Sequence, residues 1–64
     1  MINIRYSSVD GFTETKTFDT VEAASDYARY WIGKRPDIGS HYAMSDDGIG
    51  KIEVEGATLR ELFP

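Results

Sequence analysis

Cysteine is absent from this chain of 64 residues. Without cysteine, no disulfide can staple a small fold, and no thiolate can bind zinc or an iron–sulfur cluster. A cysteine-free composition is compatible with a reducing compartment, and we expect the protein to be cytoplasmic.

Basic residues and long apolar runs are also scarce. Seven Lys and Arg stand against eleven Asp and Glu, which gives a formal net charge of −4 at pH 7. This negative charge repels phosphate polyanions, so direct nucleic-acid binding is not expected. No apolar stretch approaches the roughly 20 residues of a membrane span, and the N-terminus lacks the basic and apolar regions of a secretory leader. We therefore expect no membrane partner and no leader.

The length allows one domain, residues 1–64, with one small core. At this size the free energy gained by burying apolar surface nearly balances the conformational entropy lost on folding. Because disulfides are excluded, association with a second copy is one way to gain stability, and a well-packed monomer is the alternative.

The N-terminal third predicts a β-hairpin. Apolar and polar residues alternate over 2–8 and again over 12–18, and Val9-Asp10-Gly11 between them is typical of a turn. The inward side of the second strand is predicted to carry Phe12, Glu14, Lys16 and Phe18. Since that side is apolar only at its ends, the strand is expected near an edge of the sheet.

A helix is predicted to follow, with Asp19 as N-cap, Glu22 at the third helical position and Phe18 packed on Ala23. Gly33 and Pro36 predict its end. The side facing the sheet is predicted to carry Val21, Ala24, Tyr27, Ala28, Trp31 and Ile32, and the solvent side Glu22, Ser25, Asp26 and Arg29.

The C-terminal half predicts a second hairpin and a final helical turn. Strands are predicted over 41–45, with Tyr42 and Met44 inward, and over 51–55, with Ile52 and Val54 inward. Asp46-Asp47-Gly48 predicts the turn, and Gly50 a bulge or twist point. Residues 58–61 have the spacing of a capping box, after which Leu59, Leu62 and Phe63 are predicted to close one end of the core.

The two hairpins must join into one sheet if the long helix is to have a surface to cover. The sequence therefore predicts the α+β class: a two-layer ββαββ(α) sandwich with a four-stranded, mainly antiparallel sheet packed on one amphipathic helix. The turn sequences Ser8-Val9-Asp10-Gly11 and Ser45-Asp46-Asp47-Gly48 are alike, which either an internal duplication or ordinary turn chemistry explains.

No motif predicts catalysis or a cofactor. His41 is the single histidine, and the adjacent Ser40 would point to the opposite face of a strand. Gly48-Ile49-Gly50 lacks the rest of a dinucleotide-binding fingerprint. The acidic residues of 46–55 lack the spacing of a calcium loop, so no metal site is predicted.

Charged and polar residues mark two surfaces. Arg29, Lys34 and Arg35 form the densest positive cluster, which either completes the helix end or contacts an acidic partner. The sheet face opposite the helix is predicted to be polar, and it is either simply solvated or a partner-binding platform. The candidate partner-binding residues on it are Arg5, Thr13, Thr15, Thr17, His41, Lys51, Glu53 and Glu55, and the rest of that face is predicted to carry Asn3, Ser7 and Ala43.

Three functions follow as hypotheses. The first is a non-enzymatic protein-binding or adaptor domain, with an unidentified protein or a second copy as partner, acting through the open sheet face or an edge strand. The second is an acidic mimic of nucleic acid that inhibits a nucleic-acid-binding protein, with Glu53 and Glu55 in contact. The third, a small enzyme, lacks a positioned acid, base or nucleophile.

Overall fold

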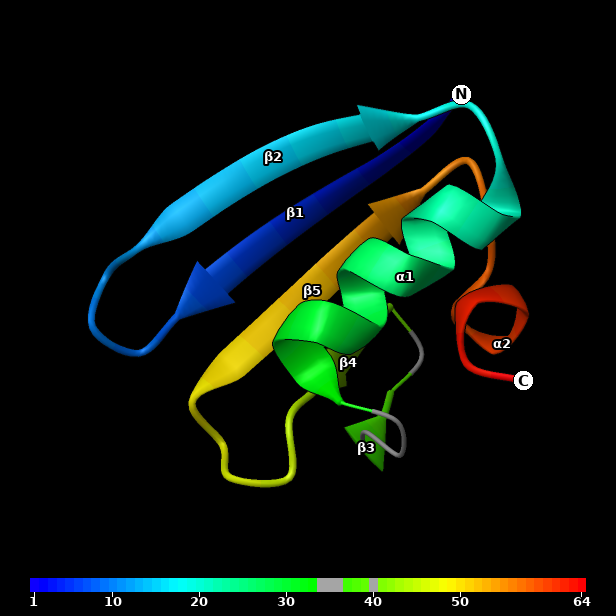
Figure 1. The fold of residues 1–64 in the computed structure, drawn as a ribbon. Coiled ribbons are helices and arrows are strands. Elements are labelled where there is room, and N and C mark those ends of the chain that lie inside the picture. The colour runs from blue at the N-terminus through cyan, green and yellow to red at the C-terminus, as the bar shows by residue number, and fades with distance from the viewer. Residues whose placement is uncertain (34–36, 40) are drawn as a thin grey trace.

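The computed structural model describes residues 1–33, 37–39 and 41–64. The described elements are, in chain order, β1 (Ile2–Ser8), β2 (Thr13–Phe18), α1 (Val21–Ile32), β3 (Asp37–Ile38), β4 (Tyr42–Met44), β5 (Gly50–Glu55) and α2 (Leu59–Leu62). Figure 1 shows α1 lying across one face of the sheet and α2 beside one end of α1. The predicted α+β sandwich is confirmed.

The two hairpins form one antiparallel sheet in the order β2-β1-β5-β4-β3. β1 and β5 join them, with Tyr6 opposite Ile52 and Ile4 opposite Val54. Four of the five strands are the predicted ones, and β2 lies at an edge as expected. β3 was missed: its two residues pair with β4 in a segment predicted to be a connection.

The core lies between α1 and the inward side of β1 and β5. Ile4, Ile52 and Leu62 are its largest fully buried side chains. Ala24 and Ala28 are fully buried on α1, and their small size brings the helix backbone close to the sheet. The predicted inward positions of β1 and β5 are therefore confirmed.

Aromatic side chains fill the flank between α1 and the first hairpin. The rings of Tyr6 and Trp31 stack with centroids 4.0 Å apart and an interplanar angle of 20°. Phe18 and Tyr27 pack beside them at 5.1 Å. Phe12, predicted to be buried, contacts Tyr6 but remains 47% exposed because it lies in the turn of the first hairpin, just before β2 begins.

The turn between β1 and β2 and the turn between β4 and β5 have the same hydrogen-bond pattern. Asp10 accepts bonds from the Ser8 hydroxyl and the Phe12 N–H, and Asp47 accepts them from the Ser45 hydroxyl and the Ile49 N–H. These bonds lower the pKa of both carboxyls, the serine hydroxyl having the larger effect in each. The likeness of the two turn sequences therefore corresponds to a shared turn structure, which ordinary turn chemistry and an internal duplication would both give.

The start of α1 was predicted one residue too early. Thr20, not Asp19, is the N-cap: its hydroxyl accepts the Ala23 N–H at 3.1 Å. Because β2 stays paired with Ile2 as far as Phe18, the chain needs both following residues to turn away from the sheet. Asp19 and Glu22 therefore do not form the predicted box. With Thr20 as N-cap, Phe18 and Ala23 do not hold the positions of the predicted hydrophobic staple. Val21, in the first turn, is 38% exposed.

Ser25 was predicted on the solvent side of the helix and is buried instead. Its hydroxyl donates to the Leu62 carbonyl oxygen at 2.6 Å. The reason is that α2 packs along that side of α1, as Figure 1 shows. α2 itself is as predicted, with reciprocal capping between Thr58 and Glu61 and with Leu59, Leu62 and Phe63 buried.

The two faces of β4 are the reverse of those predicted. Ala43 lies opposite Ile52 and is fully buried, whereas Tyr42 lies opposite Glu53 on the open face and is 41% exposed. Residues directly opposite in an antiparallel pair share a face, so the register with β5 decides the orientation. Ala43 therefore leaves the predicted polar face, and Tyr42 joins it.

Gly50 is not a bulge, because its pairing with Ser8 continues the β1–β5 register without interruption. A Cβ atom at this position would lie 2.6 Å from a ring carbon of Tyr6. Gly50 therefore marks the close approach of an aromatic ring.

No helix in the described part of the chain is both long and apolar enough to cross a lipid bilayer. The predicted positive cluster cannot be assessed as a whole, since Lys34 and Arg35 fall outside the described residues, as does Ser40.

Candidate functional site

The face of the sheet opposite α1 is built from every second residue of β1, β2 and β5. Asn3 and Arg5 lie opposite Glu55 and Glu53 respectively, and Ser7 lies opposite Lys51. Since β strands alternate their side chains between faces, these pairs all project away from the helix. The face is polar, as the sequence predicted.

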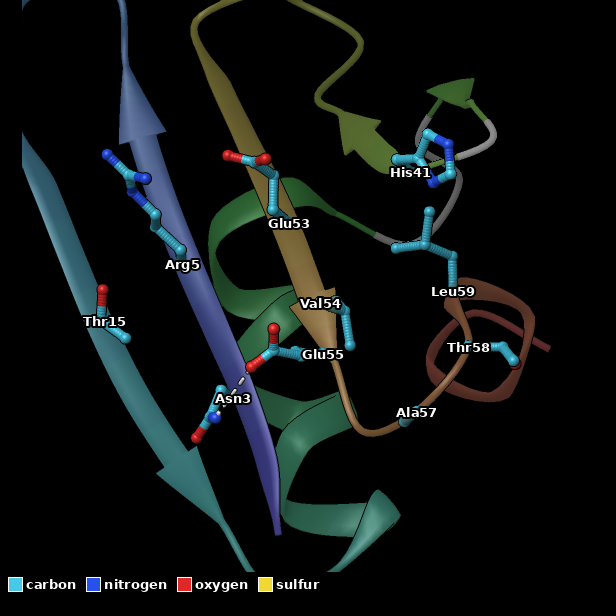
Figure 2. A pocket seen from close by; sticks show the side chains of 10 residues that line it. All are labelled: Asn3, Arg5, Thr15, His41, Glu53, Val54, Glu55, Ala57, Thr58 and Leu59. Atoms are coloured by element: carbon cyan, nitrogen blue, oxygen red, sulfur yellow. Dashed lines mark hydrogen bonds between the residues drawn. The ribbon is translucent and has the colours of Figure 1, made fainter.

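A hollow of about 650 Å³ opens on this face. Figure 2 shows its floor, formed by β2, β1 and β5, and its far wall, formed by the segment that leads into α2. The hollow is lined by Asn3, Arg5, Thr15, His41, Glu53, Val54, Glu55, Ala57, Thr58 and Leu59.

The hollow brings together five of the eight candidate residues: Arg5, Thr15, His41, Glu53 and Glu55. The other three share the face but do not line the hollow. Among them, Lys51 places its ammonium group 5.7 Å from the centre of the Tyr42 ring, and Thr17 donates a hydrogen bond to Asn3 at 2.7 Å. The polar face therefore has two parts. Five candidate residues line the hollow, and beside them Lys51 and Thr17 contact other side chains of the same face.

One wall of the hollow was not predicted from the sequence. Ala57, Thr58 and Leu59 approach the sheet because Gly56 ends β5 and the capping box of α2 then turns the chain toward α1. Val54 also lines the hollow, although its partner Ile4 is in the core. The capping-box spacing of Thr58 and Glu61 was the sequence signal that could have indicated this wall, since it predicts a helical turn directly after β5.

The charges in the hollow are of both signs. Figure 2 shows the Arg5 guanidinium and the Glu53 and Glu55 carboxylates projecting from neighbouring strands, with His41 across the hollow beside Leu59. Between the side chains of the ten lining residues, all of them described, one hydrogen bond forms, from Asn3 Nδ2 to Glu55 Oε1 at 3.4 Å. At that length the bond is weak, so the carboxylate retains capacity to accept from a partner.

Among the described residues, no group of three or more His, Asp or Glu side chains is placed so that it could hold a metal ion. Asp47 is occupied by Ser45 and the Ile49 N–H. His41 is exposed. What the hollow offers chemically is a set of charged donors and acceptors beside a short apolar wall.

Comparison of the chain with models of protein families, with curated proteins and with solved structures finds no match. The site's own geometry is therefore the basis of the functional argument.

Proposed function

We propose that this protein is a non-enzymatic protein-binding domain whose binding surface is the open sheet face around the hollow. The observation that carries the proposal is the convergence of Arg5, His41, Glu53 and Glu55 on one concave surface with apolar Val54 and Leu59 at its wall. An apolar patch beside charged groups is the usual composition of a protein contact surface.

The mixture of charges favours a polypeptide partner. Arg5 and Glu53 face each other across adjacent strands, so the surface presents a donor and an acceptor side by side. Such a surface selects a partner with complementary charges of both signs, because a wrong juxtaposition of like charges costs several kcal/mol. The same pattern disfavours the acidic-mimic hypothesis, which needs a continuous run of negative groups.

Paired variants test the proposal. Glu53→Gln with Glu55→Gln removes two charges from the hollow, and Glu22→Gln with Asp26→Asn removes two from the exposed side of α1. Both double variants, the wild-type chain and an empty matrix would be used to capture proteins from the native host, with quantification by mass spectrometry. We expect a partner that the wild-type chain and the α1 variant retain and the hollow variant loses by about tenfold or more.

Equal retention of every captured protein by both double variants would contradict the proposal. A nucleic-acid-binding protein that the wild-type chain captures, that the hollow variant loses and whose capture falls steeply with salt would instead support the acidic-mimic hypothesis. Thermal unfolding of each variant serves as the folding control.

A further inference from the structure

The outer edge of β2 has unpaired backbone groups. β2 is the terminal strand of the sheet, and Figure 1 shows no described element beyond it. The Ser8 N–H donates to the Phe12 carbonyl oxygen at 2.9 Å, while the Val9 N–H donates to Ile49, on the other side of β1. Backbone groups that face the neighbouring strand recur at every second residue of an antiparallel ladder. Those of Glu14 and Lys16 therefore face β1, and those of Thr13, Thr15 and Thr17 point outward.

The side chains of this edge are complementary to themselves in the antiparallel direction. Residues 12–18 are Phe-Thr-Glu-Thr-Lys-Thr-Phe, which is symmetric about Thr15 except that Glu14 and Lys16 have opposite charges. A second copy paired antiparallel about Thr15 would place Glu14 opposite Lys16, Lys16 opposite Glu14, and Phe12 opposite Phe18. Opposite charges, aromatic pairs and threonine pairs are each favourable across strands.

The backbone allows a two-fold axis at Thr15, and the side-chain symmetry selects that centre. Thr15 points its N–H and C=O outward, so two copies of Thr15 can exchange both hydrogen bonds on the two-fold axis. Glu14 and Lys16 then fall at non-hydrogen-bonded positions, where opposing side chains approach most closely. A centre at Glu14 or Lys16 would also allow hydrogen bonds between outward-facing threonines, but it would place two like charges opposite each other on the axis.

Tyr27 contacts both Glu14 and Lys16 on the helix side of the sheet. Its hydroxyl donates to Glu14 Oε1 at 2.6 Å, and the Lys16 ammonium lies 5.9 Å from its ring centre. A carboxylate accepts at both oxygens, so Glu14 can keep this bond and also receive Lys16 of a second copy. The Tyr27 ring shields the pair from water, which strengthens the attraction.

From this geometry we infer that the protein forms a symmetric dimer by antiparallel pairing of β2 with β2 of a second copy. A two-fold axis perpendicular to the sheet joins the two sheets, with both α1 helices on one side and both hollows on the other. The inference concerns the edge of the sheet, and it stands whether or not the hollow binds another protein.

Sedimentation equilibrium of the purified chain tests the dimer. The mass should rise from 7.2 kDa toward twice that value with concentration. A strand edge buries less than the roughly 1,200 Å² of a standard interface, so the transition is expected between about 10 µM and 1 mM. A strict monomer at about 1 mM would overturn the inference. Lys16 would then be a charged residue that prevents the edge of β2 from pairing with another strand.

Charge exchange tests the register. Lys16→Glu places Glu opposite Glu14, and Glu14→Lys places Lys opposite Lys16, so each variant alone should associate about tenfold more weakly or worse than the wild type. An equimolar mixture of the two restores both opposite-charge pairs, and native mass spectrometry should show the heterodimer. Undiminished self-association of the variants, or no heterodimer in the mixture, would refute the pairing.

Two further experiments guard against misfolding and against another interface. Thr15→Pro removes an N–H that points away from β1, so the monomer should keep its circular dichroism spectrum while the dimer is lost. In the wild type, hydrogen exchange at the Thr13, Thr15 and Thr17 amides should slow with concentration. Glu53→Gln with Glu55→Gln should leave the dimer unchanged, which separates this inference from the proposed role of the hollow. A dimer that survives Thr15→Pro, or that depends on Glu53 and Glu55, would contradict the inference.

Discussion

Gly50 has no side chain because Tyr6 occupies the space that one would need. The clash would be with a ring carbon at 2.6 Å and the hydroxyl oxygen at 2.7 Å, whereas a Cβ at Gly48 in the same hairpin meets nothing within 4 Å. Gly48 instead has a φ of 72°, which L-residues rarely adopt. Neighbouring glycines are therefore required for different physical reasons.

Alanine at each position should separate those reasons. We expect Gly50→Ala to lower the free energy of unfolding by about 1 to 3 kcal/mol through overpacking, and Gly48→Ala by about 1 kcal/mol through its backbone conformation. Urea denaturation measures both values. In a Tyr6→Leu background the cost of Gly50→Ala should shrink and that of Gly48→Ala should not; a cost of Gly50→Ala that ignores residue 6 would contradict the explanation.

The pKa of the Tyr27 hydroxyl is strongly raised in the folded chain. Partial burial, together with its hydrogen bond to Glu14, raises its pKa from 10.0 to about 12. Because the folded state holds the proton more tightly than the unfolded state, the neutral phenol stabilises the fold below pH 10, and this contribution is lost as pH rises to 12.

The wild-type chain should therefore lose stability more steeply than Tyr27→Phe between pH 10 and 12. Thermal unfolding across that range, with tyrosinate absorbance recorded in parallel, measures the effect. Tyr27→Phe should also remove the tyrosinate absorbance that appears near pH 12 in the wild type. Identical pH profiles for the two proteins would show that Tyr27 is not perturbed.

At the scale of elements, the start of α1 depends on which of two capping residues is used. Asp19 and Thr20 are both good N-caps, and sequence alone favoured Asp19 because Glu22 completes its box. The pairing of Phe18 with Ile2 shifts the choice to Thr20. A contact distant in sequence thus overrides a local signal.

Thr20→Ala should lower the free energy of unfolding by about 1 kcal/mol, the usual cost of a lost cap. Asp19→Ala should cost only a few tenths of a kcal/mol, since its charge acts on the helix dipole without a capping bond. Chemical denaturation of the two variants gives the comparison. A larger loss for Asp19→Ala would restore the capping arrangement predicted from the sequence.

The other elements show where periodicity is informative. β1 and β5 were predicted because their apolar residues alternate with charged or polar ones, and α2 because Thr58 and Glu61 cap each other. The prediction of which β4 side chains face the helix was wrong because Tyr42, Ala43 and Met44 are all apolar, so alternation does not distinguish the two faces of the strand. The prediction that Ser25 faces solvent was wrong because α2, which buries it, is distant in the sequence.

At the scale of the whole molecule, the same distinction applies to the candidate site. Strand alternation predicted the polar face, since Arg5, Glu53 and Glu55 follow directly from the phases of β1 and β5. The hollow could not be predicted, because its wall depends on how residues 57–59 pack after β5 ends. The resulting molecule has two adjoining surfaces, a mixed-charge hollow and the self-complementary edge of β2, and Thr15 belongs to both.

The central claim is that the open sheet face binds a protein partner. Backbone amide chemical shifts of the isotope-labelled chain, recorded as the captured partner is added, test it most directly. We expect shifts centred on Asn3, Arg5, Glu53 and Glu55, together with the wall at 57–59. Shifts confined to the exposed side of α1, around Glu22, Asp26 and Arg29, would contradict it.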